Sequence, residues 1–219
     1  MTISSDRGLL SDLPRRFPVF PLPGAILLPG GNLPLNIFEP RYLQMTRDAM
    51  RADKVIGMVQ PKDRGHGGDR PSFYPVGCVG RITSFEDTED GRCLITLTGI
   101  CRYQIVEELT VTTPYRQVIA TFDRWQEDLE PPNPSDSLRP HLIDALRHYF
   151  ALHEISVDWQ QIDMAPLSGL LTSLAMICPF EPSEKQALLE APDLDQLGRT
   201  LIMLLQMGSL RPEGHAAHH

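Results

Sequence analysis

The chain has 219 residues, of which 42% are hydrophobic and 22% are charged, values that are ordinary for a globular protein with a sizeable core. The net charge of −8 is uneven, because residues 1–125 carry 15 Lys and Arg against 14 Asp and Glu, whereas residues 126–219 carry 5 against 14. This balance disfavours a general nucleic-acid-binding role, which depends on Lys and Arg, and no apolar run approaches the roughly 18 residues of a membrane-spanning helix.

The chain begins with a polar stretch that leads into an extended apolar run. Residues 1–14 lack the basic and apolar regions of a signal peptide, so we expect a flexible tail and a cytoplasmic location. In Phe17-Pro-Val-Phe-Pro-Leu-Pro23 prolines alternate with apolar residues, which predicts an edge strand or an extended segment, because proline cannot donate to a β ladder. Short strands are predicted at residues 25–28 and 33–38, with a turn at residues 29–32 between them.

A helix is predicted to begin at Glu39-Pro40 and to run to about Ala52. Proline is favoured in a first helical turn, and a carboxylate suits the positive end of the helix. The apolar stripe at helical spacing comprises Tyr42, Leu43, Met45, Thr46, Ala49 and Met50.

Four further strands are predicted downstream, at residues 54–60, 73–85, 92–106 and 109–122. A polar, glycine-rich stretch at residues 61–71 is predicted to be a mobile loop. The turn Glu89-Asp90-Gly91 indicates a hairpin between the second and third of these strands. Pro114 marks a bulge or a break in the last one.

Beyond residue 137 the apolar period becomes helical. Helices are predicted at residues 138–153, 166–178, 183–190 and 193–207. Ser183 with Gln186, and Asp193 with Gln196, match the capping-box pattern at two helix starts. Gly208 is predicted to end the last helix.

These elements predict an α+β protein. A β-rich subdomain with one embedded helix spans residues 15–125, and a proline-rich linker follows at residues 126–137. A small helical bundle occupies residues 138–208, and residues 209–219 are expected to form a flexible tail.

The sequence carries no recognisable catalytic or cofactor motif. Phosphate-binding loops, dinucleotide fingerprints and the motifs H-E-x-x-H and G-x-S-x-G are missing. The cysteines form no C-x-x-C pair and are predicted to be buried thiols: Cys78, Cys93, Cys101 and Cys178. His141 and His148 share a helix face, but two histidines do not make a catalytic zinc site. We therefore expect no catalytic residue, no metal and no cofactor, with a hydrolase of unrecognised active site as an alternative.

Four segments together resemble one protein family. They are Phe17 to Gly30 continuing through Leu33-Pro-Leu-Asn-Ile-Phe-Glu-Pro-Arg-Tyr42, then Val55-Ile-Gly-Met-Val-Gln60, Tyr74-Pro-Val-Gly-Cys-Val-Gly-Arg-Ile82, and Leu97-Thr-Gly-Ile-Cys-Arg-Tyr-Gln-Ile105. In order and spacing they are similar to the N-terminal, substrate-recognition domain of Lon proteases, which also occurs in separate small proteins. The resemblance is best over residues 15–125.

The resemblance implies a PUA-like, β-barrel-like fold followed by helices. It also implies a non-catalytic module that binds protein or peptide, with unfolded or extended polypeptide segments as partners and a role in protein quality control. The chain ends where the ATPase and Ser-Lys peptidase domains of the protease would begin, so we expect a stand-alone relative that is not an enzyme. Because PUA-like folds also serve RNA, an RNA-associated role is the alternative, although the charge balance argues against it. The oligomeric state is left open.

The predicted partner-binding residues are Phe38, Glu39, Arg41, Tyr42, Met58 and Tyr103. Phe38, Met58 and Tyr103 are plausible apolar contacts, with core packing as the other interpretation. Glu39 and Arg41 flank the helix start, where one could cap the helix while the other pairs locally, or both could contact a partner. Backbone edges of proline-rich strands could accept an extended peptide by strand addition.

Overall fold

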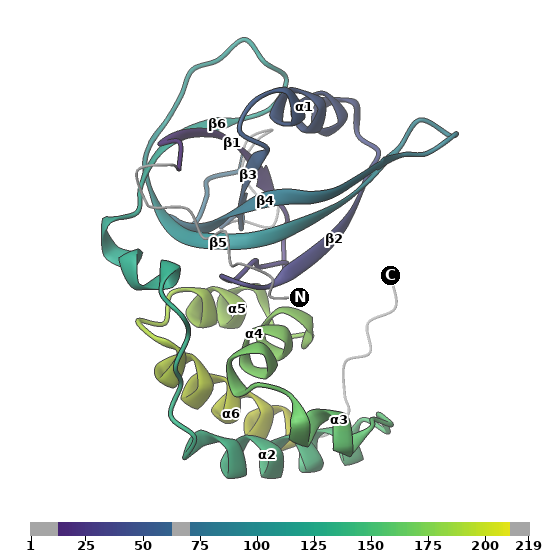
Figure 1. The fold of residues 1–219 in the computed structure, drawn as a ribbon, viewed down its shortest axis with the longest axis vertical. Coiled ribbons are helices and arrows are strands. Elements are labelled where there is room, and N and C mark those ends of the chain that lie inside the picture. The colour runs from purple at the N-terminus through teal and green to yellow at the C-terminus, as the bar shows by residue number, and fades with distance from the viewer. Residues whose placement is uncertain (1–12, 63–70, 211–219) are drawn as a thin grey trace, which may run out of the picture. The chain divides into compact units, whose positions relative to one another are not determined.

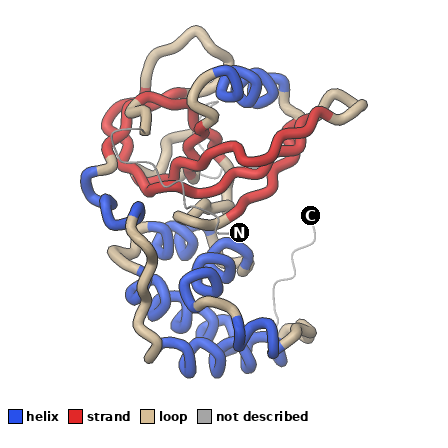
Figure 2. Tube along the Cα trace, viewed as in Figure 1, coloured by secondary structure: helices blue, strands red, loops and turns tan. Residues whose placement is uncertain are grey.

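The structure, a computed structural model, describes residues 13–62 and 71–210. Its elements in chain order are β1 (Arg16–Pro21), β2 (Asn32–Ile37), α1 (Pro40–Arg51), β3 (Val55–Val59), β4 (Val76–Asp87), β5 (Cys93–Glu108), β6 (Gln117–Thr121), η2 (Asp123–Leu129), α2 (Leu138–Leu152), α3 (Trp159–Met164), α4 (Leu167–Ile177), α5 (Pro182–Leu189) and α6 (Leu194–Leu210). They fall into two compact units, Met1–Pro131 and Pro132–His219, of which the first holds all the strands named above (Figures 1 and 2). The predicted tails and the predicted loop lie largely outside the described residues.

The strands of the first unit form a ring. The sheet order is β2-β5-β4-β3-β1-β6, and an additional pairing between β5 and β6 closes the last five of these strands upon themselves. Closure is possible because β5 is 16 residues long and changes partner along its length. One edge of β5 pairs with β2 over residues 93–98 and with β6 over residues 104–108, while its other edge pairs with β4. The predicted α+β class is confirmed, although the ring is not a regular barrel.

The prediction that residues 17–23 form an edge strand is wrong. β1 lies between β3 and β6, with residues 16–18 paired to β6 and residues 19–21 paired to β3. The Val19 amide donates to the Arg116 carbonyl on the β6 side, so by alternation the nitrogen of Pro18 faces the β3 side and that of Pro21 faces the β6 side. Each proline therefore faces the side on which its half of the strand has no registered partner, and an interior strand can accommodate both.

Two other strand predictions need correction. Residues 25–28 form no strand, although Ile26, Leu27 and Leu28 are buried, because this apolar run packs on the ring without joining its ladder. The strand predicted at residues 109–122 is reduced to β6. Pro114 lies in the irregular segment before it, where the Thr113 hydroxyl donates to the carbonyl of Tyr115 at 2.9 Å.

Helix α1 forms as predicted and packs against β1 and β3. Its buried residues are Tyr42, Met45, Thr46 and Ala49. Inside the closed sheet, the aromatic ring of Tyr103 stands edge-on to that of Phe17, with 4.9 Å between the two centroids. Gly77 has no room for a side chain, because a Cβ there would lie 2.3 Å from the Met58 carbonyl oxygen and 2.5 Å from Tyr103. The close strand approach at this point therefore requires glycine.

The second unit is a bundle in which α2 and α6 pack along each other. Helices α2, α4, α5 and α6 correspond to the four predicted helices. Helix α3 of this unit and η2 of the first unit were not predicted. None of the helices in the described residues is long and apolar enough to cross a lipid bilayer.

Two local predictions in this unit are wrong. Helix α6 does not end at Gly208 but continues to Leu210. A Cβ on Gly208 would lie 3.0 Å from the ring of Tyr149, so this glycine permits close packing of α6 on α2. The capping box of α5 is formed by Glu181 and Glu184, because the helix begins at Pro182, one residue before the predicted cap Ser183.

Candidate functional site

The turn between β2 and α1 forms an exposed corner. Phe38 follows the last residue of β2, and 64% of its surface is exposed. Glu39 is the N-cap of α1, and its backbone carbonyl accepts hydrogen bonds from the amides of Tyr42 and Leu43, each at 2.9 Å. The Glu39 side chain does not cap the helix; it accepts a hydrogen bond from Arg41 Nε at 2.9 Å and forms an ion pair with the same guanidinium at 2.7 Å.

Aromatic packing holds this corner in place. The guanidinium of Arg41 lies over the ring of Tyr42, 4.6 Å from its centroid. Tyr42 is buried and stands edge-on to Phe20 with 4.4 Å between centroids, and burial raises the pKa of its hydroxyl. The ion pair is exposed, so it contributes little to stability by itself. The contacts of Tyr42 with Arg41 and Phe20 fix the position of the turn that carries Phe38.

The strand register places a second exposed apolar side chain beside Phe38. Asn36 is paired with Leu94 of β5, and Ile37 with Cys93. Because side chains alternate along a strand, Asn36 and Leu94 share the face opposite to buried Ile37, and the exposure of Phe38, the first residue after β2, fits the same alternation. Leu94 is 41% exposed. We call Phe38, Leu94 and the Glu39–Arg41 ion pair the β2 corner.

The sheet face next to the β2 corner is polar. The Thr98 hydroxyl donates to Asn32 Oδ1 at 2.7 Å and lies 2.9 Å from the hydroxyl of Thr83. This row joins β2, β5 and β4 across their outer face. Phe38 and Leu94 are the exposed large apolar residues near the end of this polar row.

Only part of the predicted residue set lies at this corner. Phe38, Glu39 and Arg41 are at its surface, with Tyr42 beneath them. Met58 and Tyr103 are 1% and 0% exposed and lie in the core, where no partner reaches them in this conformation. Sequence reasoning missed Leu94, although an apolar residue at an outward position between Cys93 and Ile95 was a readable signal.

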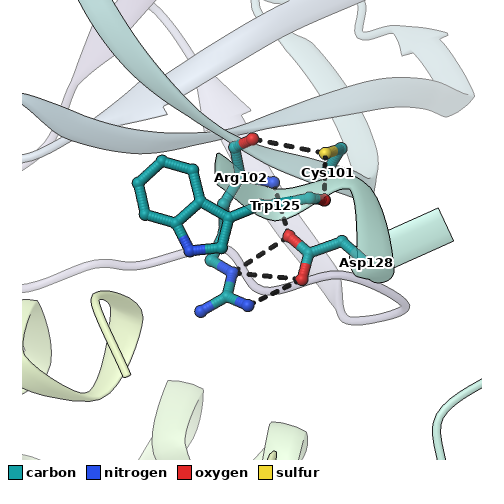
Figure 3. Close-up of polar contacts among 4 residues, drawn as sticks. All are labelled: Cys101, Arg102, Trp125 and Asp128. Atoms are coloured by element: carbon teal, nitrogen blue, oxygen red, sulfur yellow. Dashed lines mark hydrogen bonds and ion pairs between the residues drawn. The ribbon is translucent and has the colours of Figure 1, made fainter. Parts of the chain in front are cut away.

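A buried ion pair ties β5 to η2 (Figure 3). Arg102 and Asp128 have side chains that are 9% and 8% exposed, and the Arg102 NH2 group lies 2.7 Å from Asp128 Oδ1. The Arg102 amide also donates to Asp128 Oδ2 at 2.9 Å, and the guanidinium lies 5.5 Å from the ring centroid of Trp125. Both oxygens of the Asp128 carboxylate are bonded by Arg102, which indicates that the ion pair has a structural role and holds η2 against β5.

The cysteines do not offer an activated nucleophile. Burial, with the nearby charge of Asp128, raises the pKa of Cys101 to about 12, and its thiol lies 3.3 Å from the Trp125 carbonyl oxygen. Burial likewise raises the pKa of Cys93 and of Cys178 to about 11, and that of Cys78 far above its usual range. Because the thiolate is the reactive form, these groups are unreactive at neutral pH.

A shallow depression of about 340 Å³ lies where the segment after residue 70 meets the end of β5. Arg116 on its wall has its charge compensated by Glu108, with contacts of 2.8 and 2.5 Å, and donates to the Pro71 carbonyl at 2.7 Å. Its guanidinium also stacks 3.3 Å from the centroid of Phe73. This arginine holds the local structure together and presents no uncompensated charge. No group of three His, Cys, Asp or Glu side chains within residues 13–62 and 71–210 is placed to hold a metal ion.

Comparisons with known proteins agree on one family. The family model described as the ATP-dependent protease La (LON) substrate-binding domain matches residues 16–207. The chain is 30% identical over 117 residues to Lon protease 2 of Myxococcus xanthus, which covers 52% of this chain and 14% of that protease. It is 22% identical over 198 residues to the Lon protease of Desulfosudis oleivorans, covering 85% of this chain and 23% of that protease. The match therefore spans less than a quarter of these relatives.

Solved structures show the same fold. A Lon N-terminal domain protein from Xanthomonas campestris matches with a TM-score of 0.58 and 24% identity, over 87% of this chain and 96% of that one. The N-terminal domain of a Mycobacterium avium complex Lon protease matches with a TM-score of 0.61 and 17% identity, over 87% and 97% of the two chains.

Proposed function

The chain belongs to the family of Lon substrate-binding domains, and we propose that it is a non-catalytic module that binds unfolded or extended polypeptide segments in protein quality control, with the β2 corner as its contact surface. The proposal concerns binding alone. The relatives are named as proteases, but the match covers only a small part of each, and their proteolysis is not carried over to this chain.

The exposure of Phe38 is the observation that carries this proposal. Burying a phenylalanine side chain stabilises a contact by about 1.5–3 kcal/mol, so a phenylalanine that is 64% exposed on a packed corner favours association. Leu94 extends the apolar surface, and the Glu39–Arg41 pair forms a polar rim beside it. An apolar centre with a polar rim is the usual arrangement of a protein-binding hot spot.

The charges near the corner do not favour RNA. Arg41 is paired with Glu39, Arg47 with Asp87 at 3.6 Å, and Arg92 with Asp90 at 2.9 Å. Paired guanidinium groups offer little net positive potential to a phosphate backbone.

Titration with an unfolded protein tests the proposal. Fluorescently labelled lactalbumin, reduced and carboxymethylated so that it stays unfolded, is expected to bind the purified chain with a Kd in the micromolar range, and ATP should not change it. Phe38→Ser should weaken binding roughly 10-fold or more, as expected for a hot-spot residue.

Val106→Ser is the matched control. Val106 is 65% exposed on the same unit, but it lies at the register shift between β5 and β6. Its substitution should leave the affinity unchanged. Absence of binding at high micromolar concentration, or equal losses in the two variants, would contradict the proposal.

A further inference from the structure

Strand β2 has an unused edge. In the sheet order it stands at the end, where it pairs with β5 and with no other strand of the described residues (Figure 1). The other five strands are closed into the ring, although β4 beyond Arg81 has a strand partner on one side only, which is β5. An edge of unpaired amide and carbonyl groups is a template for another extended chain.

The phase of the ladder shows which backbone groups are unused. The Gly99 amide donates to the Gly31 carbonyl at 2.8 Å, and in an antiparallel pair such bonds recur at every second residue. Leu33, Leu35 and Ile37 therefore bond to β5. The backbone groups of Asn32, Pro34 and Asn36 point away from it, and the side chains of these three residues are exposed.

We infer that the polypeptide bound at the β2 corner adds to β2 as an extra strand, and that the edge selects segments with an apolar side chain at every second residue. This inference rests on the proposed function and specifies its ligand. A strand laid antiparallel along β2 would exchange two hydrogen bonds with Asn32 and two with Asn36. At Pro34 it would donate one bond and receive none, because proline has no N–H.

The side chains of β2 set the pattern of the ligand. Leu33 and Leu35 are on the core side of the strand but are only half-buried, whereas Ile37 on the same side is 2% exposed. Ligand residues opposite Leu33 and Leu35 would point to this side and cover the part that is still open. The intervening ligand residues would lie on the outer face, next to Asn32, Pro34 and Asn36. A segment that alternates apolar and polar residues would place its apolar side chains on the core side and its polar side chains on the outer face.

Pro34 limits what the edge can take. Its missing N–H removes the central donor of the edge, which weakens pairing with any strand and with β2 of a second copy alike. A ligand can compensate through apolar contacts with Leu33, Leu35 and Phe38. In a dimer formed through this edge, the second β2 would also lack the N–H donor at its own Pro34.

Backbone methylation of a model peptide tests the binding mode. The probe is a labelled peptide of about nine residues with alternating valine and threonine, compared with one of the same composition in which the valines are adjacent. The alternating peptide should bind roughly 10-fold more tightly. In its bound register the threonine N–H groups face β2 and the valine N–H groups face away. N-methylation of the threonines should abolish binding, and N-methylation of the valines should not weaken it.

A gain-of-affinity variant provides the second test. Pro34→Ala restores the missing donor and should tighten binding about 2- to 10-fold, the effect of one added hydrogen bond. Pro114→Ala, at an exposed proline in an irregular segment, should have no effect.

The possible results separate the inference from the function on which it rests. If unfolded lactalbumin binds but the peptides bind equally well with either set of N-methyl groups, strand addition is overturned and polypeptide binding stands. If neither lactalbumin nor any peptide binds, both fail. If the native chain forms a dimer in sedimentation and the alternating peptide binds the monomer only, or not at all, while Pro34→Ala strengthens the dimer, a second copy occupies the edge and the inference is overturned.

Discussion

The hydroxyl of Tyr103 donates a hydrogen bond to the backbone carbonyl of Met58 at 3.1 Å, inside the strand ring. This bond crosses from β5 to β3, two strands that are both neighbours of β4. Tyr103 is fully buried, and burial raises the pKa of its hydroxyl well above the usual value. The hydroxyl is therefore neutral and available as a donor at neutral pH.

Removing this hydroxyl should lower stability without affecting binding. Tyr103→Phe keeps the aromatic packing on Phe17 but removes the donor, so we expect a loss of about 1 kcal/mol in the free energy of unfolding. Urea denaturation measures the loss, and lactalbumin titration should give an unchanged Kd. A weakened Kd in a fully folded variant would instead give Tyr103 a part in binding.

The buried ion pair should be far more sensitive than an exposed one. Asp128→Ala leaves Arg102 buried without its carboxylate and should lower the free energy of unfolding by about 3 kcal/mol. Asp90→Ala removes a partner of Arg92 at a site where both side chains are more than half exposed. This substitution should change the free energy of unfolding by less than about 1 kcal/mol. Equal effects in chemical denaturation would be evidence against the structural tie between β5 and η2.

Two glycine-to-alanine substitutions should have opposite effects. Gly77→Ala forces a Cβ against the Met58 carbonyl oxygen and Tyr103, and should cost several kcal/mol or prevent folding. Gly169→Ala, in α4, meets no atom within 4 Å and should stabilise the chain by about 0.5–1 kcal/mol. Thermal melts of the two variants provide the comparison, and a stable Gly77→Ala protein would rule out the close strand approach.

Alkaline pH should destabilise the fold through its buried thiols. The pKa of Cys101 is raised from 9.0 to about 12, chiefly by burial. Between about pH 9 and pH 12 the unfolded chain releases a proton that the folded chain keeps, so stability falls as the pH rises. Below pH 9 both states hold the proton, and this contribution is fully present.

A non-titrating variant isolates this effect. Cys101→Val has no thiol to ionise, so its urea midpoint should fall less between neutral pH and about pH 10 than that of the native chain. Parallel declines in the two proteins would mean that other groups cause the loss.

Local sequence signals predicted the parts of the fold that depend on neighbouring residues. The start of α1 at Pro40 follows from a proline and an acidic residue placed before an apolar stripe. The hairpin between β4 and β5 follows from Glu89-Asp90-Gly91, where Gly91 has a φ of 84°. Phe38, Glu39 and Arg41 were predicted together because they belong to a continuous segment at this boundary, and all three are at the surface.

The features that were missed depend on distant partners. Residues 17–23 could not be recognised as an interior strand, because its two neighbours lie about 40 and 100 residues further along the chain. Gly208 was predicted to end its helix, because its close contact with Tyr149 of another helix is not visible in the local sequence. For Met58 and Tyr103 the sequence left partner contact and core packing both open, because the ring that encloses them is built from strands spread over the first unit.

The pairing of β1 with β6 also bears on how the chain folds as it is made. Arg16 pairs with Ile119, so β1 cannot find this neighbour until more than a hundred residues have followed it. Contacts at such long separation form slowly, because the intervening chain must be ordered first. We therefore expect β1 to remain incompletely paired during translation, and its prolines, which cannot donate to a β ladder, to disfavour pairing with another chain in that interval.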